Sequence, residues 1–334
     1  MKRPSKLLFC TSLILTVAIG LVACSSLKNN LSADSDNVIG FITTKTLPEA
    51  SGLAASSLNP NTLWSHNDSG NTPSLIAFDQ HGQFQTQIHI SGVENNDWED
   101  LATFEYKGQH YLLIADTGDN YANRDVYQLH IIREPKITEQ TTLTVSPEWT
   151  IRYNYPDGAH DCESVAVDQI NEKILLLSKR DEQPILFELP LTNNVSLSNQ
   201  ALTTNHVSKL DPDSSIYLQT DNQIAKQVAL LDPFPNSSNP EFSLIDLFGY
   251  STMPTAMDIS KNGQFVAVLT YNSAFVYHTH QSTNWAEIML STPTQIEFSP
   301  LKQAESIAFS SDSQHIYITS EKLPAPILKI ATPK

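Results

Sequence analysis

A short phrase recurs along the chain and constrains its fold more than any other feature. It consists of an acidic or small polar start followed by apolar residues that alternate with alanine, and it is clearest at residues 305–309. Copies begin near residues 50, 100, 163 and 255 as well. Each copy is followed by a second apolar run that ends in polar residues. A chain that repeats the start of one strand in this way is expected to form a repeat architecture.

Turns rich in Asn, Gly, Asp or Ser separate the two runs of each copy, as at residues 107–109 and 261–263. Such turns tolerate the positive φ angles of tight hairpins, so the runs are expected to be antiparallel strands. A third run usually follows, which makes a meander of three or four strands. A β-sandwich would not repeat the sequence of its first strand, and a β-helix has a shorter period. The sequence therefore predicts an all-β fold, a β-propeller.

The number of blades is open between five and six. The interval from residue 163 to residue 255 is too long for one blade, so either the third blade carries an insertion or another blade lacks the phrase. Its candidate strands are at residues 215–218, 227–231 and 242–248. Residues 38–44 form a strand without a partner of its own. We predict that this N-terminal strand pairs with the last blade, beside residues 327–330, because that pairing leaves no open sheet edge.

Residues 1–24 have the pattern of a lipoprotein signal peptide with a lipobox. A basic start is followed by an apolar run and by small residues that end at Cys24. The alternative, an uncleaved membrane helix, is disfavoured because the run is short for a full span. We expect acyl chains on Cys24 to anchor the protein to a membrane. Ser25 and Ser26 follow the cysteine without an Asp, which favours the outer membrane, on its periplasmic or surface face.

Residues 25–37 are expected to be a flexible tether and residues 38–334 a single propeller domain. The net charge of the chain is −16, which should repel nucleic acid and suits the binding of cations. Once the signal is removed and Cys24 is acylated, Cys162 is the one cysteine left in the fold. An intrachain disulfide is therefore excluded.

Four copies of the phrase begin with a glutamate, and the first strand of each propeller blade lines the central channel. These residues are Glu49, Glu99, Glu163 and Glu305. Converging carboxylates repel one another unless water, basic residues or a cation lie between them. Because Ca²⁺ prefers oxygen ligands, this ring is a candidate calcium site at the channel mouth. Alternatively, the glutamates cap backbone amides of neighbouring blades.

Further polar residues lie where the second strands end or where the first strands begin. The candidate ligand-binding residues are His66, Asn67, Asp119, Asn120, Lys179, Arg180 and Glu321, and the candidate catalytic bases are Asp68, Asp116 and His160. Loops on a rigid scaffold often carry binding and catalytic residues. The same segments are good turn sequences, so a purely structural role is the alternative.

Several of these motifs, taken together, resemble a known family. They lie at residues 64–70, 97–100, 116–120, 155–161, 255–260, 303–309 and 319–321. They resemble the largely uncharacterised bacterial secreted β-propeller lipoproteins related to the phytase-like domain, which is often described as having esterase-like activity. The resemblance spans residues 47–330. By looser analogy with calcium-dependent phytases and lactonases, it implies a metal at the channel mouth. The chain departs from the family at Ala304, where Gly is expected, and at Cys162, where Ala is usual.

Two functional hypotheses follow. In the first, a membrane-anchored envelope lipoprotein binds a small molecule or an envelope protein at the acidic mouth, without catalysis. In the second, a Ca²⁺-dependent hydrolase acts on a phosphate ester or a carboxylic ester, with the cation polarising the substrate and activating water. Basic residues that could hold a highly phosphorylated substrate are scarce, which counts against phytate. Fold analogy alone does not decide between the two hypotheses.

Overall fold

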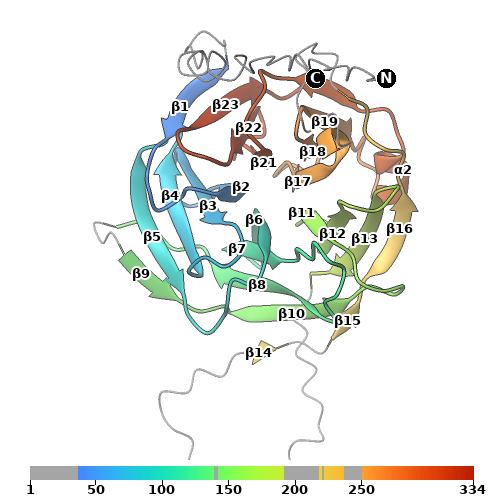
Figure 1. The fold of residues 1–334 in the computed structure, drawn as a ribbon, viewed down its shortest axis with the longest axis horizontal. Coiled ribbons are helices and arrows are strands. Elements are labelled where there is room, and N and C mark those ends of the chain that lie inside the picture. The colour runs from blue at the N-terminus through green and yellow to red at the C-terminus, as the bar shows by residue number, and fades with distance from the viewer. Residues whose placement is uncertain (1–36, 139–141, 192–217, 220–221, 237–249) are drawn as a thin grey trace, which may run out of the picture. The chain divides into compact units, whose positions relative to one another are not determined.

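The computed structural model describes residues 37–138, 142–191, 218–219, 222–236 and 250–334, which form five sheets arranged as the blades of a propeller (Figure 1). The strands are antiparallel except for short parallel additions in two of the blades. The predicted all-β propeller is confirmed, with five blades. The signal peptide, residues 25–36 of the tether, the strand at 242–248 and most of the strand at 215–218 lie outside the described residues. Among the described residues, no helix has the length and apolar character needed to cross a membrane.

The blades follow one another along the chain. Blade 1 consists of β2 (Ala50–Ala55), β3 (Thr62–Asn67), β4 (Ser74–Asp79) and β5 (Phe84–Ile90), with β9 (Thr142–Val145) parallel to β5. Blade 2 consists of β6 (Trp98–Tyr106), β7 (Gln109–Asp116), β8 (Tyr127–Arg133) and β10 (Trp149–Asn154), with β14 (Leu218–Gln219) and β15 (Gln223–Ile224) parallel to β10. Blade 3 consists of β11 (Cys162–Asp168), β12 (Lys173–Ser178), β13 (Ile185–Pro190) and β16 (Lys226–Leu230). The strand expected at 227–231 is therefore the outer strand of blade 3.

The last two blades complete the ring. Blade 4 consists of β17 (Pro254–Ile259), β18 (Phe265–Thr270), β19 (Ser273–His278) and β20 (Thr294–Glu297), preceded by the 3₁₀ turn η1 (Tyr250–Thr252), with helix α2 (Trp285–Met289) between β19 and β20. Blade 5 consists of β21 (Ala304–Phe309), β22 (His315–Ser320), β23 (Ala325–Ala331) and the N-terminal β1 (Val38–Ile42). The predicted closure is confirmed, because Val38 pairs with Leu328 and Ile42 with Ala325.

The closing strand β1 is also held on its other side, by the turn between β4 and β5. Phe41 N donates a hydrogen bond to His81 O (3.2 Å), and a His81 ring nitrogen lies 2.8 Å from Ile39 O. Gly40 packs so closely that a Cβ at this position would lie 2.5 Å from the carbonyl carbon and oxygen of His81. Strand β1 thus joins blade 5 to blade 1.

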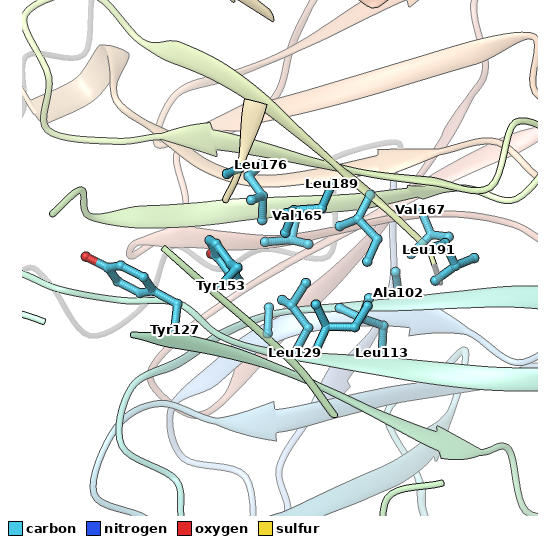
Figure 2. Close-up of a cluster of buried hydrophobic side chains, with 14 of the residues drawn as sticks. Ala102, Leu113, Tyr127, Leu129, Tyr153, Val165, Val167, Leu176, Leu189 and Leu191 are labelled. Carbon is cyan, nitrogen blue, oxygen red and sulfur yellow. The ribbon is translucent and has the colours of Figure 1, made fainter. Parts of the chain in front are cut away.

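The core lies between the blades rather than within one layer. Five clusters of buried apolar side chains each join two neighbouring blades. Figure 2 shows the cluster in which Leu113 and Leu129 of blade 2 meet Val165 and Leu176 of blade 3. Each such side chain contributes about 1.5–3 kcal/mol when it is fully buried. Because blade packing buries both faces of the inner strands, the repeated phrase is apolar throughout rather than alternately polar.

The inner strands β2, β6, β11, β17 and β21 contact one another in sequence order and close the ring (Figure 1). Polar groups also connect the blades near the axis. The Asp100 carboxylate accepts hydrogen bonds from Val165 N (2.8 Å) and Met257 N (3.0 Å), on blades 3 and 4. Thr255 Oγ1 donates to Ala304 O (2.7 Å), between blades 4 and 5. These bonds fix the relative positions of the inner strands, whose first residues lie at the end of the ring that we call the mouth.

Candidate functional site

Three inner strands place a glutamate at the mouth by means of a β-bulge. The pairing register with the second strand shifts at Glu99, Glu163 and Glu305. A bulge leaves one residue out of the ladder and redirects its side chain. All three side chains are largely buried, with exposed fractions of 6%, 5% and 8%. The structure thus brings together three of the four predicted ring residues, and Thr255 occupies the bulge of blade 4.

Glu49 is not part of this set. It precedes β2, is exposed, and accepts a hydrogen bond from Asn71 Nδ2 (3.2 Å). The bulge residue of blade 1 is Gly52, with a φ of 70°. A Cβ on Gly52 would lie 2.6 Å from His66 Nε2, so only glycine fits here. The expectation that Glu49 is equivalent to the other three glutamates was therefore wrong. Glu49 lies two residues farther from the first apolar residue of its strand than the other three glutamates do.

The first acidic group at the mouth comprises Asp68, Asp97 and Glu99, whose oxygens lie within 4.8 Å of one another. Among the described residues, the carboxylates of Asp97 and Glu99 have no hydrogen-bond donor and no ion-pair partner, while Asp68 accepts a bond from Ser69 N (2.5 Å). Burial, with the charges of Asp68 and Asp161, raises the pKa of Asp97 to about 6. Burial and neighbouring carboxylates also raise the pKa of Glu99 well above its usual range. Among the described residues, this group therefore has no hydrogen bond or ion pair to a basic side chain, although the charges of Lys179 and Arg124 lower the pKa values of its members.

Gly118 leaves the space into which two of these carboxylates fit. A Cβ on Gly118 would lie 2.5 Å from Asp97 Oδ2 and closer still to Glu99 Oε1. The residue is fixed in the loop after β7 because Gly118 N donates to Asp97 O (3.2 Å). Any larger residue would therefore displace the group.

The second acidic group comprises Glu99, Asp161 and Glu163, again with oxygens within 4.8 Å of one another. In contrast to the first group, two of its members have basic partners. Lys179 Nζ forms an ion pair with Glu163 Oε2, and Arg180 Nε lies 2.6 Å from Asp161 Oδ2. Burial works against the charge of Lys179, but Glu163 and its neighbours raise the pKa of Lys179 above its usual value.

A hydrogen-bonded chain continues from Lys179 across blades 4 and 5. Lys179 Nζ donates to Tyr271 OH (3.1 Å), and Tyr271 OH donates to Glu305 Oε1 (3.0 Å). Burial, together with the hydrogen-bonded neighbour Glu321, raises the pKa of Glu305 to about 8. Burial also raises the pKa of Glu321. The predicted residues Lys179, Glu305 and Glu321 therefore meet at the mouth through Tyr271.

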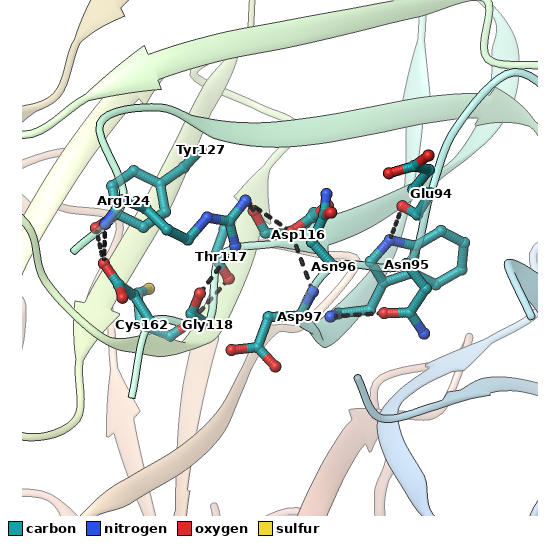
Figure 3. A network of polar contacts seen from close by, with 12 residues as sticks. Glu94, Asn95, Asn96, Asp97, Asp116, Thr117, Gly118, Arg124, Tyr127 and Cys162 are labelled. Carbon is teal, nitrogen blue, oxygen red and sulfur yellow. Dashed lines mark hydrogen bonds and ion pairs between the residues drawn. The ribbon is translucent and has the colours of Figure 1, made fainter. Parts of the chain in front are cut away.

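Asp116 and Asp119 both bond Arg124 at the end of β7 and in the loop that follows it, and Figure 3 shows Asp116 beside Arg124. The Asp116 carboxylate lies 2.8 Å from Arg124 NH2 and accepts a hydrogen bond from Asn96 Nδ2 (2.8 Å). Asp119 accepts bonds from Arg124 N (2.8 Å) and Tyr127 OH (2.9 Å), which with other bonds keep its pKa low despite burial. Both aspartates hold the loop through these bonds and belong to neither acidic group. Asn120 lies at the rim, where its Oδ1 accepts a bond from Arg180 NH2.

His66 and Asn67 support blade 1. The His66 ring is fully buried, packs edge-on against Trp98 with ring centroids 5.6 Å apart, and has a pKa that burial lowers to about 4. Asn67 holds the preceding loop, because its Oδ1 accepts a bond from Glu49 N (3.2 Å) and its Nδ2 donates to Thr46 O (2.8 Å).

His160 lies between two carboxylates. Its Nδ1 is 2.9 Å from Asp181 Oδ2, and its Nε2 is 3.0 Å from Asp157 Oδ1. Asp181 in particular raises the pKa of His160 above its usual value, although burial opposes this. Because both ring nitrogens are engaged, the imidazole has no free position with which to accept a proton from water.

Sequence reasoning missed Asp97, Asp161, Gly118 and Tyr271. Both aspartates stand two residues before a ring glutamate, a spacing that repeats at blades 2 and 3. Tyr271 directly follows the second strand of blade 4, the place that Lys179 and Glu321 occupy in blades 3 and 5. Alignment of the second strands would have found Tyr271.

No known protein-family model matches this chain, and no curated protein matches it. Solved structures with a similar arrangement of strands have low sequence identity. They include U3-55K (10% identity, TM-score 0.38, covering 85% of this chain and 68% of that one), a luciferin-regenerating enzyme (9%, 0.39, 86% and 92%) and a nidogen/laminin complex (10%, 0.41, 81% and 72%). The acidic groups at the mouth could hold a metal ion.

Proposed function

We propose that the mouth binds one divalent cation through Asp68, Asp97 and Glu99, and that the bound cation in turn binds an anionic group of a ligand. The observation that carries this proposal is the first acidic group itself. Its oxygens lie within 4.8 Å of one another, and among the described residues neither the Asp97 nor the Glu99 carboxylate has a hydrogen-bond or ion-pair partner. Buried unpaired carboxylates are costly, and a cation removes that cost.

Calcium is the cation that fits this donor set best. All three donors are carboxylates, which are hard oxygen ligands, and they come from two segments: Asp68 follows β3, and Asp97 and Glu99 lie at the start of β6. Ca²⁺ accepts six to eight oxygens in flexible geometry, whereas Mg²⁺ demands a near-ideal octahedron. Three side chains fill only part of this shell. Water or a ligand would supply the remaining oxygens.

The ligand is expected to bind through the cation instead of through basic side chains. Arg124, Lys179 and Arg180 are each paired with a carboxylate. Lys322 Nζ donates to Gln303 Oε1. A phosphate or carboxylate would have to displace these bonds to reach a basic side chain, but it needs only to replace water on a cation. This supports the binding of a small molecule or an envelope protein that presents one anionic group.

Hydrolysis of a phosphate ester or carboxylic ester is the second candidate function. It is favoured by one observation, the buried Glu305 carboxyl with a pKa of about 8 beside Tyr271. A carboxyl that is protonated near neutral pH can donate a proton to a leaving group. A cation would polarise the ester. Of the three predicted bases, only Asp68 belongs to the acidic groups. In this second function Asp68 would be the general base, and Asp97 and Glu99 would hold the cation.

Cation binding is tested by calorimetric titration and by thermal unfolding of the purified protein, in EDTA and then with Ca²⁺ restored. We expect one bound Ca²⁺ and a reversible rise in melting temperature, because a ligand of the folded state stabilises it. Asp97→Asn should weaken binding strongly. Glu105→Gln, which changes an exposed carboxylate near the other end of β6, is the matched control. If Ca²⁺ neither binds nor shifts the melting temperature, the cation site is excluded. If Ca²⁺ binds, assays with a panel of phosphate and carboxylic esters distinguish hydrolysis from binding alone.

We also propose that the protein is a lipoprotein of the outer membrane. The lipobox that ends at Cys24 supports this proposal. Metabolic labelling with palmitate should mark the wild-type protein, and Cys24→Ala should abolish the label. Fractionation of the two membranes would then locate the labelled protein. A wild-type protein without label would refute the anchor.

A further inference from the structure

The second acidic group already contains a positive charge supplied by the protein. Glu99, Asp161 and Glu163 are only 6%, 4% and 5% exposed. Three carboxylates this close and this buried need positive charge among them. The Lys179 ammonium provides it through its ion pair with Glu163, and the Lys179 side chain is only 4% exposed.

The backbone places Lys179 at this position. It directly follows β12, and Lys179 N donates a hydrogen bond to Asp161 O (2.8 Å), which fixes its Cα opposite the start of β11. Tyr271 OH accepts a second bond from the ammonium (3.1 Å). Arg180 Nε neutralises Asp161 at 2.6 Å. The ammonium is therefore held by Glu163 and Tyr271, beside the carboxylates of the second group.

Glu99 belongs to both acidic groups and is the member of the second group whose carboxylate has no hydrogen-bond or ion-pair partner among the described residues. It is more than nine-tenths buried. A shared carboxylate between two positions is the arrangement that lets two cations lie a few ångströms apart. Here one of the two positions is filled from within the chain.

We infer that Lys179 is a built-in occupant of a second cation position, so that the mouth takes one divalent cation where its carboxylates could hold two. The claim that a divalent cation fills the first position rests on the proposed function. The claim that Lys179 fills the second position does not. A tethered single charge repels a neighbouring divalent cation half as strongly as a second divalent cation would. Lys179 thereby sets both the number of ions and the charge left for a ligand.

Removal of the ammonium should open the second position. Lys179→Met keeps a long apolar stem and deletes the charge, whereas Lys179→Arg keeps the charge and is the matched control. In calorimetric titration with Ca²⁺ at fixed ionic strength, we expect one ion per chain for the wild type and Lys179→Arg, and two for Lys179→Met. Lys179→Gln, which retains a donor for Tyr271, provides a second neutral variant if Lys179→Met does not fold.

Each outcome distinguishes this inference from the proposed function. Two ions bound to the wild type, or one ion bound to both neutral variants, would overturn the role of Lys179. No ion on the wild type and one on a neutral variant would refute the proposed function and support the inference. A neutral variant that folds only with Ca²⁺ supports it too. Neutral variants that remain unfolded at saturating Ca²⁺ count against it, because an open position should be filled by the ion.

Discussion

Replacement of Gly118 by Ala tests the cation site without any change of charge. A Cβ at this position would lie 2.5 Å from Asp97 Oδ2 and closer to Glu99 Oε1, whereas an ordinary carbon–oxygen contact begins at 3.4 Å. Both carboxylates must therefore move by roughly 1 Å, which exceeds the tolerance of Ca²⁺–oxygen bonds of about 2.3–2.6 Å. Displacement of two of the three ligands should weaken Ca²⁺ binding by about 100-fold or more, beyond the 10–100-fold typical of lost supporting contacts.

The fold itself should tolerate this substitution. Gly118 is not among the residues with positive φ, and the displaced atoms are the ends of flexible side chains. We expect the melting temperature in EDTA to change little, while the stabilisation by Ca²⁺ disappears. Calorimetric titration measures the affinity, and paired thermal scans measure the stability. An affinity within threefold of the wild type would refute the placement of the site between Asp97 and Glu99.

Three further predictions concern the scaffold. Asp100→Ala should lower the free energy of unfolding in urea by about 3 kcal/mol or more, because it leaves the N–H groups of Leu101, Val165 and Met257 without their buried acceptor; a loss below 1 kcal/mol would contradict this. Gly40→Ala should cost about 1–3 kcal/mol, because its Cβ meets the backbone of His81, and an unchanged urea midpoint would argue against the tight seating of β1. Burial lowers the pKa of His130 to about 4 from its ordinary 6.5. The unfolded chain therefore binds a proton more readily than the folded protein, and the free energy of unfolding should fall by roughly 3 kcal/mol as the pH falls from 6.5 to 4. His130→Phe should remove that loss, and equal acid sensitivity of variant and wild type in urea titrations at pH 7 and pH 4 would disprove the assignment.

The repeated phrase predicted the ring of inner strands because their burial on both faces leaves a strong apolar signature. It also predicted the closing strand, since an unpaired apolar strand at one end needs a partner at the other. The parallel additions of β9 and of β14 and β15 were not foreseen. They are short pairings with the outer strands β5 and β10, and no local sequence pattern predicts such a pairing.

The sequence predicted the chemical character of the candidate site but not which residues form it. Acidic residues at equivalent strand starts indicated a mouth rich in carboxylates, and Glu99, Glu163 and Glu305 do meet there. The division into an unpaired and a paired group could not be predicted, because it depends on which basic side chains reach across between blades. Glu49 was misplaced because the position of the bulge is fixed by its distance from the apolar residues of the strand. In blade 1 that position is occupied by Gly52, not by the acidic residue.

The pairing of β1 with β23 also determines when the molecule can be completed during synthesis. About 280 residues lie between these partners, so the N-terminal strand must wait for nearly the whole chain to emerge. Closing so long a loop is slow, and an unpaired strand edge is prone to pair with other chains in the meantime. Premature termination before residue 325 would leave β1 without its partner while retaining most of the blades. The last strand thus decides whether the nascent ring becomes one molecule or an aggregate.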